Sequence, residues 1–186
     1  MSRKFSTQLT GFGEAGRVDL AGGSPYHHLM HKTNAMRILE SLGISYTTQS
    51  YDWDENHIDA KHVCEELHLD PEQVFKTIVL EDSDKQKFVF CLPAESVISM
   101  KRVREITGSK TIDLLPLKDL QKTTGYIRGG CSPLGMIRKF PTYIEETAQL
   151  FDTIYVSAGM RGLQLCLRPD DLLKAAEATW ADFTQA

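Results

Sequence analysis

The feature that most constrains the fold is a pair of apolar segments joined by a short polar turn. Residues 74–80 (VFKTIVL) and 87–93 (KFVFCLP) are rich in β-branched and aromatic side chains, and residues 81–84 (EDSD) between them are polar. Two such segments around a polar turn predict a β-hairpin. The chain is therefore expected to contain at least this antiparallel pair of strands.

Helices and further strands are predicted on both sides of the hairpin from the spacing of apolar residues and from capping residues. The first helix, capped by Thr33 or Asn34, is expected to carry Met36, Leu39 and Leu42 on one side. The last is expected to follow Pro169 and to bury Leu172, Leu173, Ala176 and Trp180. Other helices are predicted over 60–67, from 70, from 99 to 108 and from 116, and other strands over 45–52, 142–145, 152–157 and 162–167.

The order of these elements mixes strands and helices without a strict β-α-β repeat. That order favours an α+β fold, with a mixed, partly closed, β-barrel-like sheet surrounded by helices. Residues 1–30 have scattered glycines and no sustained periodicity, and we expect a flexible arm or an expression leader there. Residues 31–186 are then one domain, which fits a chain of 186 residues.

Composition narrows the class of protein. Hydrophobic residues make up 41% of the chain and charged residues 25%, as in soluble globular proteins. No apolar run approaches the ~20 residues needed to cross a bilayer, and no signal peptide is recognisable, so a cytoplasmic protein without membrane association is expected. The net charge of −4 argues against a general DNA- or RNA-binding protein, although basic residues cluster at 101–104 and around Arg128 and Arg138.

Lys76 is the most unusual single residue, because it interrupts an otherwise apolar strand. A buried ammonium group is costly unless it is paired or used in function. The alternative interpretation is a lysine on an edge strand, which points to solvent and prevents aggregation. The strand alternation places Thr77 on the opposite side from Lys76.

Two loops rich in small residues are candidate ligand-binding segments. In Arg128-Gly129-Gly130-Cys131-Ser132, adjacent glycines permit close backbone approach and can direct N–H groups at an oxygen. The segment 157–162 follows an apolar strand and offers Ser157, a glycine and Arg161 for contact with phosphate or ribose. An ordinary turn is an alternative interpretation for each.

Other chemistries find little support in the sequence. The chain has no G-x-S-x-G nucleophile motif, no phosphate-binding loop of the Walker type and no cofactor motif outside the N-terminal arm. Its four cysteines are widely spaced, and the pair Cys64 and His68 offers too few ligands for a structural zinc, so no metal or cofactor is expected. Cys131 lacks a neighbouring histidine in the sequence, which makes it a weak candidate nucleophile.

From Thr33 to the C-terminal helix, the chain resembles the YbaK/EbsC family of prolyl-tRNA editing domains. The likeness to its freestanding branch of Cys-tRNA(Pro) deacylases rests on three segments in order: 70–80 (DPEQVFKTIVL), 124–136 (TGYIRGGCSPLGM) and 152–165 (DTIYVSAGMRGLQL). The resemblance implies a mixed sheet ringed by helices. It also implies trans-editing, the hydrolysis of the ester that joins a mischarged amino acid to the 3′-terminal adenosine of tRNA.

The same resemblance assigns roles to particular residues. It implies that Lys76 holds the terminal phosphate or ribose and stabilises developing charge, and that Gly129 and Gly130 contact the ester carbonyl, so these three are the predicted catalytic residues. The predicted substrate-binding residues are Tyr51, Thr77, Ser132, Glu145, Ser157 and Arg161.

Two departures from the family pattern bear on the amino acid that is removed. Glu145-Glu146-Thr147 stands where close relatives carry an aspartate followed by Ala-Pro, and residues 56–60 lack the aromatic residue expected near the pocket. The alternatives are therefore a deacylase for Ala-tRNA(Pro) or for another small amino acid, and a noncatalytic module that binds tRNA or a partner on the same scaffold.

The resemblance also implies partners and a mechanism. The expected partners are the acceptor end of tRNA(Pro) and prolyl-tRNA synthetase, with no DNA. An aminoacyl ester is already activated, so positioning and charge stabilisation can suffice. Attack by the substrate's own thiol and attack by a held water are both compatible with the sequence.

Overall fold

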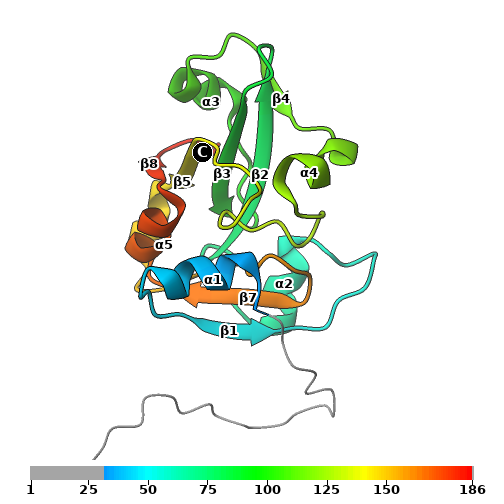
Figure 1. Cartoon of the computed structure of the whole chain (residues 1–186), viewed down its shortest axis with the longest axis vertical. Helices are drawn as coiled ribbons and strands as arrows, with labels where there is room; N and C mark the ends of the chain where they lie inside the picture. The colour runs from blue at the N-terminus through cyan, green and yellow to red at the C-terminus, as the bar shows by residue number, and fades with distance from the viewer. Residues whose placement is uncertain (1–31, 186) are drawn as a thin grey trace, which may run out of the picture. The chain divides into compact units, whose positions relative to one another are not determined.

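The computed structural model describes residues 32–185 (Figure 1). The predicted arm over residues 1–30 and the domain boundary at residue 31 lie outside the described residues, so both stay predictions. The helices in the described part are α1 (Asn34–Ser41), α2 (Ala60–Leu67), α3 (Met100–Thr107), α4 (Leu117–Thr124), α5 (Pro169–Ala176) and the 3₁₀ helix η1 (Glu146–Leu150). The strands are β1 (Thr47–Ser50), β2 (Val74–Asp82), β3 (Lys87–Pro93), β4 (Ile112–Leu114), β5 (Thr142–Glu145), β6 (Ile154–Ser157), β7 (Leu163–Leu167) and β8 (Thr179–Ala181).

The strands form one mixed sheet, as predicted. Its order is β1-β7-β6-β2-β3-β5-β8, and β4 pairs with β2 outside this path. The β2–β3, β2–β4, β1–β7 and β6–β7 pairs are antiparallel, whereas β2–β6, β3–β5 and β5–β8 are parallel. Strands β1 and β8 end the path without pairing with each other, so the sheet does not close into a barrel.

The predicted hairpin is the centre of this sheet. Strands β2 and β3 pair in register from Phe75↔Pro93 to Glu81↔Lys87. Figure 1 shows α4 and α5 on either side of this hairpin and α3 near its tip. Strand β2 also pairs with β6 and β4 near its two ends, so it is not an edge strand of the sheet, although at Lys76 it pairs with β3 alone. The Lys76 ammonium donates to two backbone carbonyls, which does not fit a lysine that points freely to solvent.

Two large clusters of buried side chains hold the helices on the sheet. The first joins α1 and α5 to strands β5, β6 and β7, and the second packs Val103 of α3 and Phe183 against Phe88 and Phe90 of β3. The Phe90 ring stacks on Tyr143 and meets the edge of Phe183. Full burial of each such side chain contributes about 1.5–3 kcal/mol, so these clusters fix the position of the hairpin.

The capping residues predicted at the ends of the helices are largely confirmed. The Thr33 side chain caps α1 by accepting from the Met36 N–H, and Gly43 and Gly108 have the positive φ values of +65° and +69° typical of residues that end helices. Of the three apolar residues expected on one side of this helix, Met36 and Leu39 are buried, whereas Leu42 follows the last residue of α1 and is 45% exposed.

Two other sequence expectations fail, and two short strands were not predicted. Residues 70–72 form a turn rather than a helix start, in which the Asp70 carboxylate accepts from the Glu72 N–H. Trp180 lies in β8 and not on α5, which ends at Ala176. Strands β4 and β8 have three residues each, too few for a periodic pattern, and they form because they pair with β2 and β5.

None of the helices within residues 32–185 has the length and the apolar character that a membrane span requires.

Candidate functional site

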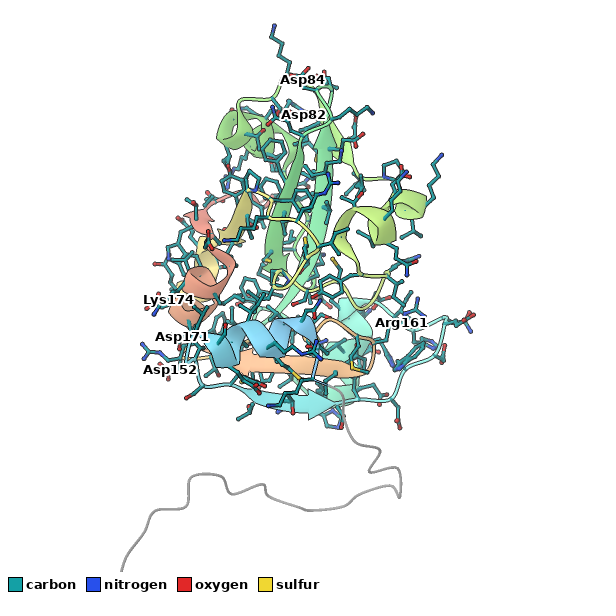
Figure 2. All side chains as sticks on the ribbon, in the orientation of Figure 1. Asp82, Asp84, Asp152, Arg161, Asp171 and Lys174 are labelled. Atoms are coloured by element: carbon teal, nitrogen blue, oxygen red, sulfur yellow. The ribbon has the colours of Figure 1, made fainter. Side chains whose placement is uncertain are left out.

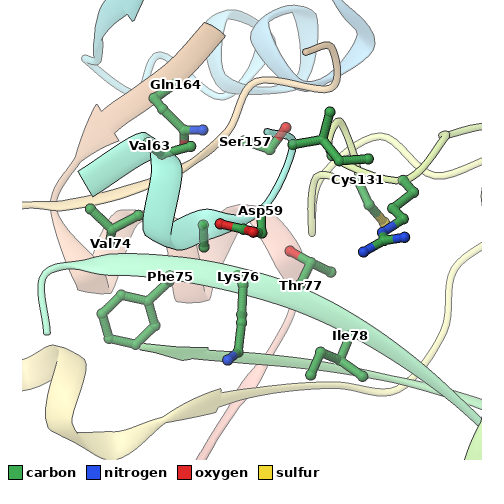
Figure 3. A pocket seen from close by; sticks show the side chains of 14 residues that line it. Asp59, Val63, Val74, Phe75, Lys76, Thr77, Ile78, Cys131, Ser157 and Gln164 are labelled. Atoms are coloured by element: carbon green, nitrogen blue, oxygen red, sulfur yellow. The ribbon is translucent and has the colours of Figure 1, made fainter. Parts of the chain in front are cut away.

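A cavity of about 200 Å³ opens between β2, the start of α2, the loop 128–132 (the glycine loop), the end of β6 and the start of β7 (Figure 3). We call it the editing pocket, after the family that the sequence resembles. It brings together Lys76 and Thr77 with Gly129 and Ser157, which the sequence places in three separate motifs. The complete lining consists of Ile58, Asp59, Ala60, Val63, Val74, Phe75, Lys76, Thr77, Ile78, Arg128, Gly129, Cys131, Ser157 and Gln164.

Lys76 lines the pocket, and backbone carbonyls hold its ammonium group on the side of β2 opposite to Thr77 (Figure 3). Its Nζ donates to Ala94 O and to Ser96 O, both at 2.7 Å, which leaves one of its three N–H groups for another acceptor. Burial lowers the pKa of the Lys76 ammonium, and the negative charges of Asp59 and Glu95 oppose this shift. Lys76 is therefore a positioned cation in a half-buried site.

Asp59 supplies the negative charge of the pocket. It caps the N-terminus of α2, where its Oδ1 accepts from the His62 N–H at 2.9 Å. The same carboxylate lies in the pocket lining, as Figure 3 shows, and acts on Lys76. The sequence pattern 56–60 gave no reason to select Asp59, because its role depends on the packing of α2 against β2.

The glycine loop lies close to two other segments. Gly129 has φ +82°, and a Cβ there would lie 2.9 Å from Ile58 Cβ and 3.0 Å from Ile58 O. At Gly130 a Cβ would lie 3.1 Å from the backbone of Met160 and of Arg161. Both positions therefore need glycine for close approach, which an ordinary turn would not require.

The loop is also tied to the turn that follows β6. Arg161 Nε donates to Arg128 O at 2.9 Å, and the Arg161 guanidinium lies over the Trp53 ring, 5.0 Å from its centroid. Arg161 itself does not line the editing pocket. Its contact with the loop links the two predicted ligand-binding segments physically.

Hydroxyl and thiol groups line the remaining wall. Ser157 Oγ accepts from the Gly159 N–H at 3.3 Å, and Thr77 Oγ1 lies 3.8 Å from Cys91 Sγ. Figure 3 shows Lys76 and Thr77 leaving β2 on opposite sides, as the alternation predicts. Burial raises the pKa of the Cys131 thiol to about 12, so this thiol is uncharged near neutral pH.

Gln164 of β7 is a pocket residue that sequence reasoning missed. Its side chain is 4% exposed, and within the described residues its Oε1 has no hydrogen-bond partner. A buried carbonyl oxygen without a partner costs about 1–3 kcal/mol. Such an atom at a pocket wall is suited to a ligand that donates a hydrogen bond, and no feature of the strand sequence alone marks it.

Three further predicted substrate residues lie outside the pocket lining, besides Arg161. Tyr51 packs against the cluster of Val63, Cys64 and Val74 behind the pocket wall. Ser132 is buried, and its Oγ accepts from the Leu134 N–H at 3.3 Å, which shapes the loop. Glu145 is 1% exposed at the end of β5, where its Oε2 accepts from the Phe183 N–H at 2.9 Å. Its predicted place at the substrate pocket is therefore corrected, because its side chain turns toward the β8 side of the fold.

The burial of Glu145 gives a pH-dependent prediction. Burial raises the pKa of this carboxyl above its ordinary value of 4.5, so its stabilising contribution is present below that value and is lost as pH rises through the raised pKa. Glu145→Gln keeps an acceptor for Phe183 but cannot ionise. We expect its unfolding free energy, measured by urea denaturation, to exceed that of the wild type by an amount that grows as pH rises from 4.5. A constant difference across this range would contradict the assignment.

The arrangement can hold a polar, activated ester. It combines two cations, Lys76 and Arg128, with one carboxylate, a backbone loop and a buried carbonyl oxygen, all around a small cavity. Within residues 32–185, no group of three or more His, Cys, Asp or Glu side chains is placed to hold a metal ion.

Comparison with known proteins agrees with the family resemblance seen in the sequence. A family model described as an aminoacyl-tRNA editing domain matches residues 54–175. A protein of Enterococcus faecalis whose name assigns it as a Cys-tRNA(Pro)/Cys-tRNA(Cys) deacylase, EbsC, is 40% identical over 153 residues, which is 82% of this chain and 93% of the relative. The segments that line the editing pocket fall inside the matched region.

Solved structures of low sequence identity share the fold. One is described as a trans-editing enzyme for prolyl-tRNA synthetase, with a TM-score of 0.69, 17% identity and coverage of 81% of this chain and 94% of that chain. Another, a hypothetical protein, has a TM-score of 0.75, 16% identity and coverage of 82% and 100%. These matches confirm the predicted mixed sheet with surrounding helices.

Proposed function

This chain belongs to the aminoacyl-tRNA editing domain family, and from that premise we propose that it is a trans-editing hydrolase that removes the amino acid from mischarged tRNA, with Cys-tRNA(Pro) as its main substrate. The observation that carries the proposal is that Lys76, Gly129 and Ser157, which come from three separate motifs, all line the editing pocket. The cysteine substrate follows the name of the Enterococcus faecalis relative.

The pocket supplies what ester hydrolysis needs. In the proposed complex, the free N–H of Lys76 donates to the terminal ribose or phosphate and stabilises negative charge as it develops. The loop at Gly129 and Gly130 is proposed to contact the ester carbonyl through its backbone. Gly129 lines the pocket, and the two glycines let the loop pack closely against Ile58 and against the backbone of Met160 and Arg161. Ser157 and Thr77 contribute hydroxyl groups to the binding of the ribose or the amino acid.

Substrate selection by side chain rests on the small size of the cavity, about 200 Å³, which favours a small amino acid. A pocket distinguishes side chains that differ by one small group by only about 1–3 kcal/mol. Alanine therefore stays the alternative amino acid. Both the substrate's own thiol and a held water remain possible nucleophiles, and only cysteine offers the first.

Gln164 is proposed to receive the α-ammonium group of the bound amino acid at its Oε1. Gln164→Leu removes the buried unpaired oxygen, so we expect the unfolding free energy to rise by about 1 kcal/mol. The loss of a charge-assisted hydrogen bond should lower kcat/KM for Cys-tRNA(Pro) about 10- to 100-fold. Gln49→Leu is the matched control, because Gln49 lies opposite Gln164 on β1 but does not line the pocket. Unchanged activity in Gln164→Leu would remove this residue from the substrate site.

Cys131 is not expected to act as a nucleophile, although it lines the pocket. A thiol whose pKa is raised to about 12 has almost no thiolate at neutral pH, and the thiolate is the reactive form. Cys131→Ser should therefore retain most of the deacylase activity. A complete loss of activity in a folded Cys131→Ser protein, with rapid alkylation of wild-type Cys131 by iodoacetamide, would show the opposite.

A noncatalytic binding module on the same scaffold is the second candidate, and the net charge of −4 motivates it. Incubation of the purified full chain with several mischarged tRNAs separates the two functions. The enzyme releases at least one amino acid, and Cys-tRNA(Pro) should be deacylated fastest. Binding of these tRNAs without release of any amino acid would favour the module.

The proposed partners are the acceptor end of mischarged tRNA(Pro) and prolyl-tRNA synthetase, in the cytoplasm. The acidic net charge suggests weak intrinsic affinity for tRNA, so a synthetase that presents the tRNA would increase selectivity. Sedimentation of the chain with synthetase and tRNA(Pro) together tests this association. A chain that sediments alone under all conditions would count against it.

A further inference from the structure

A second cavity, next to the editing pocket, has the chemistry of a surface for single-stranded RNA. It measures about 480 Å³ and is lined in part by Leu117 and Lys118 of α4, by Ile127 and Arg128 of the following loop, and by Ile58 and Arg161. We call it the acceptor groove. Ile58 and Arg128 line both cavities, so the groove continues the editing pocket.

The groove is basic in a chain that is acidic overall. Lys118, Arg128 and Arg161 line it together with a single carboxylate, that of Glu55. In the part of the chain that the structure describes, none of the three cations forms an ion pair with a carboxylate. Cations of this kind attract phosphate groups, so the local charge complements a nucleic-acid backbone even though the net charge of the chain is −4.

Exposed apolar side chains lie in the groove and beside it. Ile127, 43% exposed, and Leu117, 58% exposed, line the groove. Trp53 does not line it, but its ring lies beneath the Arg161 guanidinium of the lining and is 42% exposed. Proteins that bind single-stranded RNA stack unpaired bases on aromatic rings and guanidinium planes, and this stacking tolerates any base. Exposed apolar groups next to cations without a carboxylate partner are therefore suited to bind nucleotides, whose bases stack and whose phosphates are negatively charged.

We propose that the acceptor groove binds the two unpaired nucleotides that precede the terminal adenosine of tRNA. This inference rests on the proposed function, which puts the aminoacylated end of the tRNA in the editing pocket. The terminal adenosine then lies at the junction formed by Ile58 and Arg128, and the preceding bases contact Trp53 and Ile127. The phosphates between them contact Lys118 and Arg128, and the double-stranded stem stays outside.

A binding experiment tests the groove independently of catalysis. The probe is an uncharged acceptor-stem RNA hairpin that ends in single-stranded CCA, compared by fluorescence anisotropy at low ionic strength with the same hairpin lacking CCA. The full-length wild-type chain should bind the first RNA at least about tenfold more tightly, because base stacking contributes to affinity at every unpaired base. Lys118→Glu and Trp53→Ala should each abolish this preference.

The matched control is Lys174→Glu, since Lys174 lies on α5, on the opposite side of Figure 2 from Arg161. It should keep the preference for CCA, and thermal melting checks that every variant folds. Equal affinity of wild type for both RNAs, or an unchanged preference in folded Lys118→Glu and Trp53→Ala, would overturn the proposal. Deacylation of Cys-tRNA(Pro) is measured separately, so an inactive wild type that still prefers CCA would contradict the proposed function and leave the groove supported.

Discussion

Replacing Lys76 by alanine is expected to lower the rate of cysteine release from Cys-tRNA(Pro) by about 10²–10³-fold, as for the loss of one group that stabilises charge in a transition state. The ammonium is fixed by Ala94 O and Ser96 O at 2.7 Å and has one donor left for the substrate. Its loss removes the one lysine that lines the editing pocket. The rate is measured as release of labelled cysteine under single-turnover conditions, where binding and chemistry are separated.

The control for this prediction must separate catalysis from folding, because Lys76 also bridges two backbone carbonyls. Lys87→Ala is matched: Lys87 lies on the neighbouring strand β3, and its Nζ also donates to a backbone carbonyl, that of Lys85. It lies at the other end of the hairpin and should retain activity. If Lys76→Ala stays folded by thermal melting and keeps full activity, the role given to Lys76 is wrong.

The second large effect is expected at Gly129. An alanine Cβ there would approach Ile58 Cβ to 2.9 Å and Ile58 O to 3.0 Å, and φ is +82°. The loop must shift away from Ile58, which moves the groups that contact the ester carbonyl. Because misplacement of about 1 Å can cost about 10²-fold in rate, Gly129→Ala should lower kcat/KM for Cys-tRNA(Pro) by that order.

Gly43→Ala separates the backbone strain from the loss of positioning. Gly43 has a similar φ of +65°, but a Cβ there would meet nothing within 4 Å, and it lies at the end of α1 outside the pocket. Both variants should melt at lower temperature, and only Gly129→Ala should lose activity. Parallel losses of activity in the two would attribute the effect to stability alone.

The parts of the fold that the sequence predicts are those that depend on neighbouring residues. The hairpin at residues 74–93 is confirmed because two β-branched, aromatic strands meet across a polar turn. The ends of α1 and α3 are confirmed because Gly43 and Gly108 adopt a conformation that glycine favours. Strand β8 could not be predicted, since its three residues have no pattern of their own and pair with β5 far away in the chain.

The residues of the candidate site also fall into two groups, those that the sequence selects and those that only the folded structure identifies. Lys76 is unusual within its own strand, and Gly129 and Gly130 are unusual within their own loop, so sequence reasoning selects them. Asp59 and Gln164 have ordinary surroundings in the sequence, and only the packing of α2 and β7 around one cavity identifies them. Their roles, like those of all the pocket residues, stay predictions.

Glu145 shows the opposite case, where a sequence comparison suggested a role that packing does not support. Its carboxylate accepts from the Phe183 N–H, and Glu145 itself pairs with Ala181 of β8, so this residue helps to attach the C-terminal segment to β5. The presence of glutamate at position 145 is therefore not an argument against cysteine as the amino acid that is removed. The membership of the family, in contrast, is confirmed over most of the chain.

The most direct test of the central claim is a side-by-side deacylation of Cys-tRNA(Pro) and Ala-tRNA(Pro) by the purified wild-type chain. We expect both esters to be accessible to the small pocket and the cysteinyl ester to be hydrolysed at least about tenfold faster, a difference of about 1.4 kcal/mol in transition-state stabilisation. Equal rates would make the enzyme a general editor of small amino acids that uses water as the nucleophile. Release of neither amino acid, from tRNAs that the chain binds, would contradict the account.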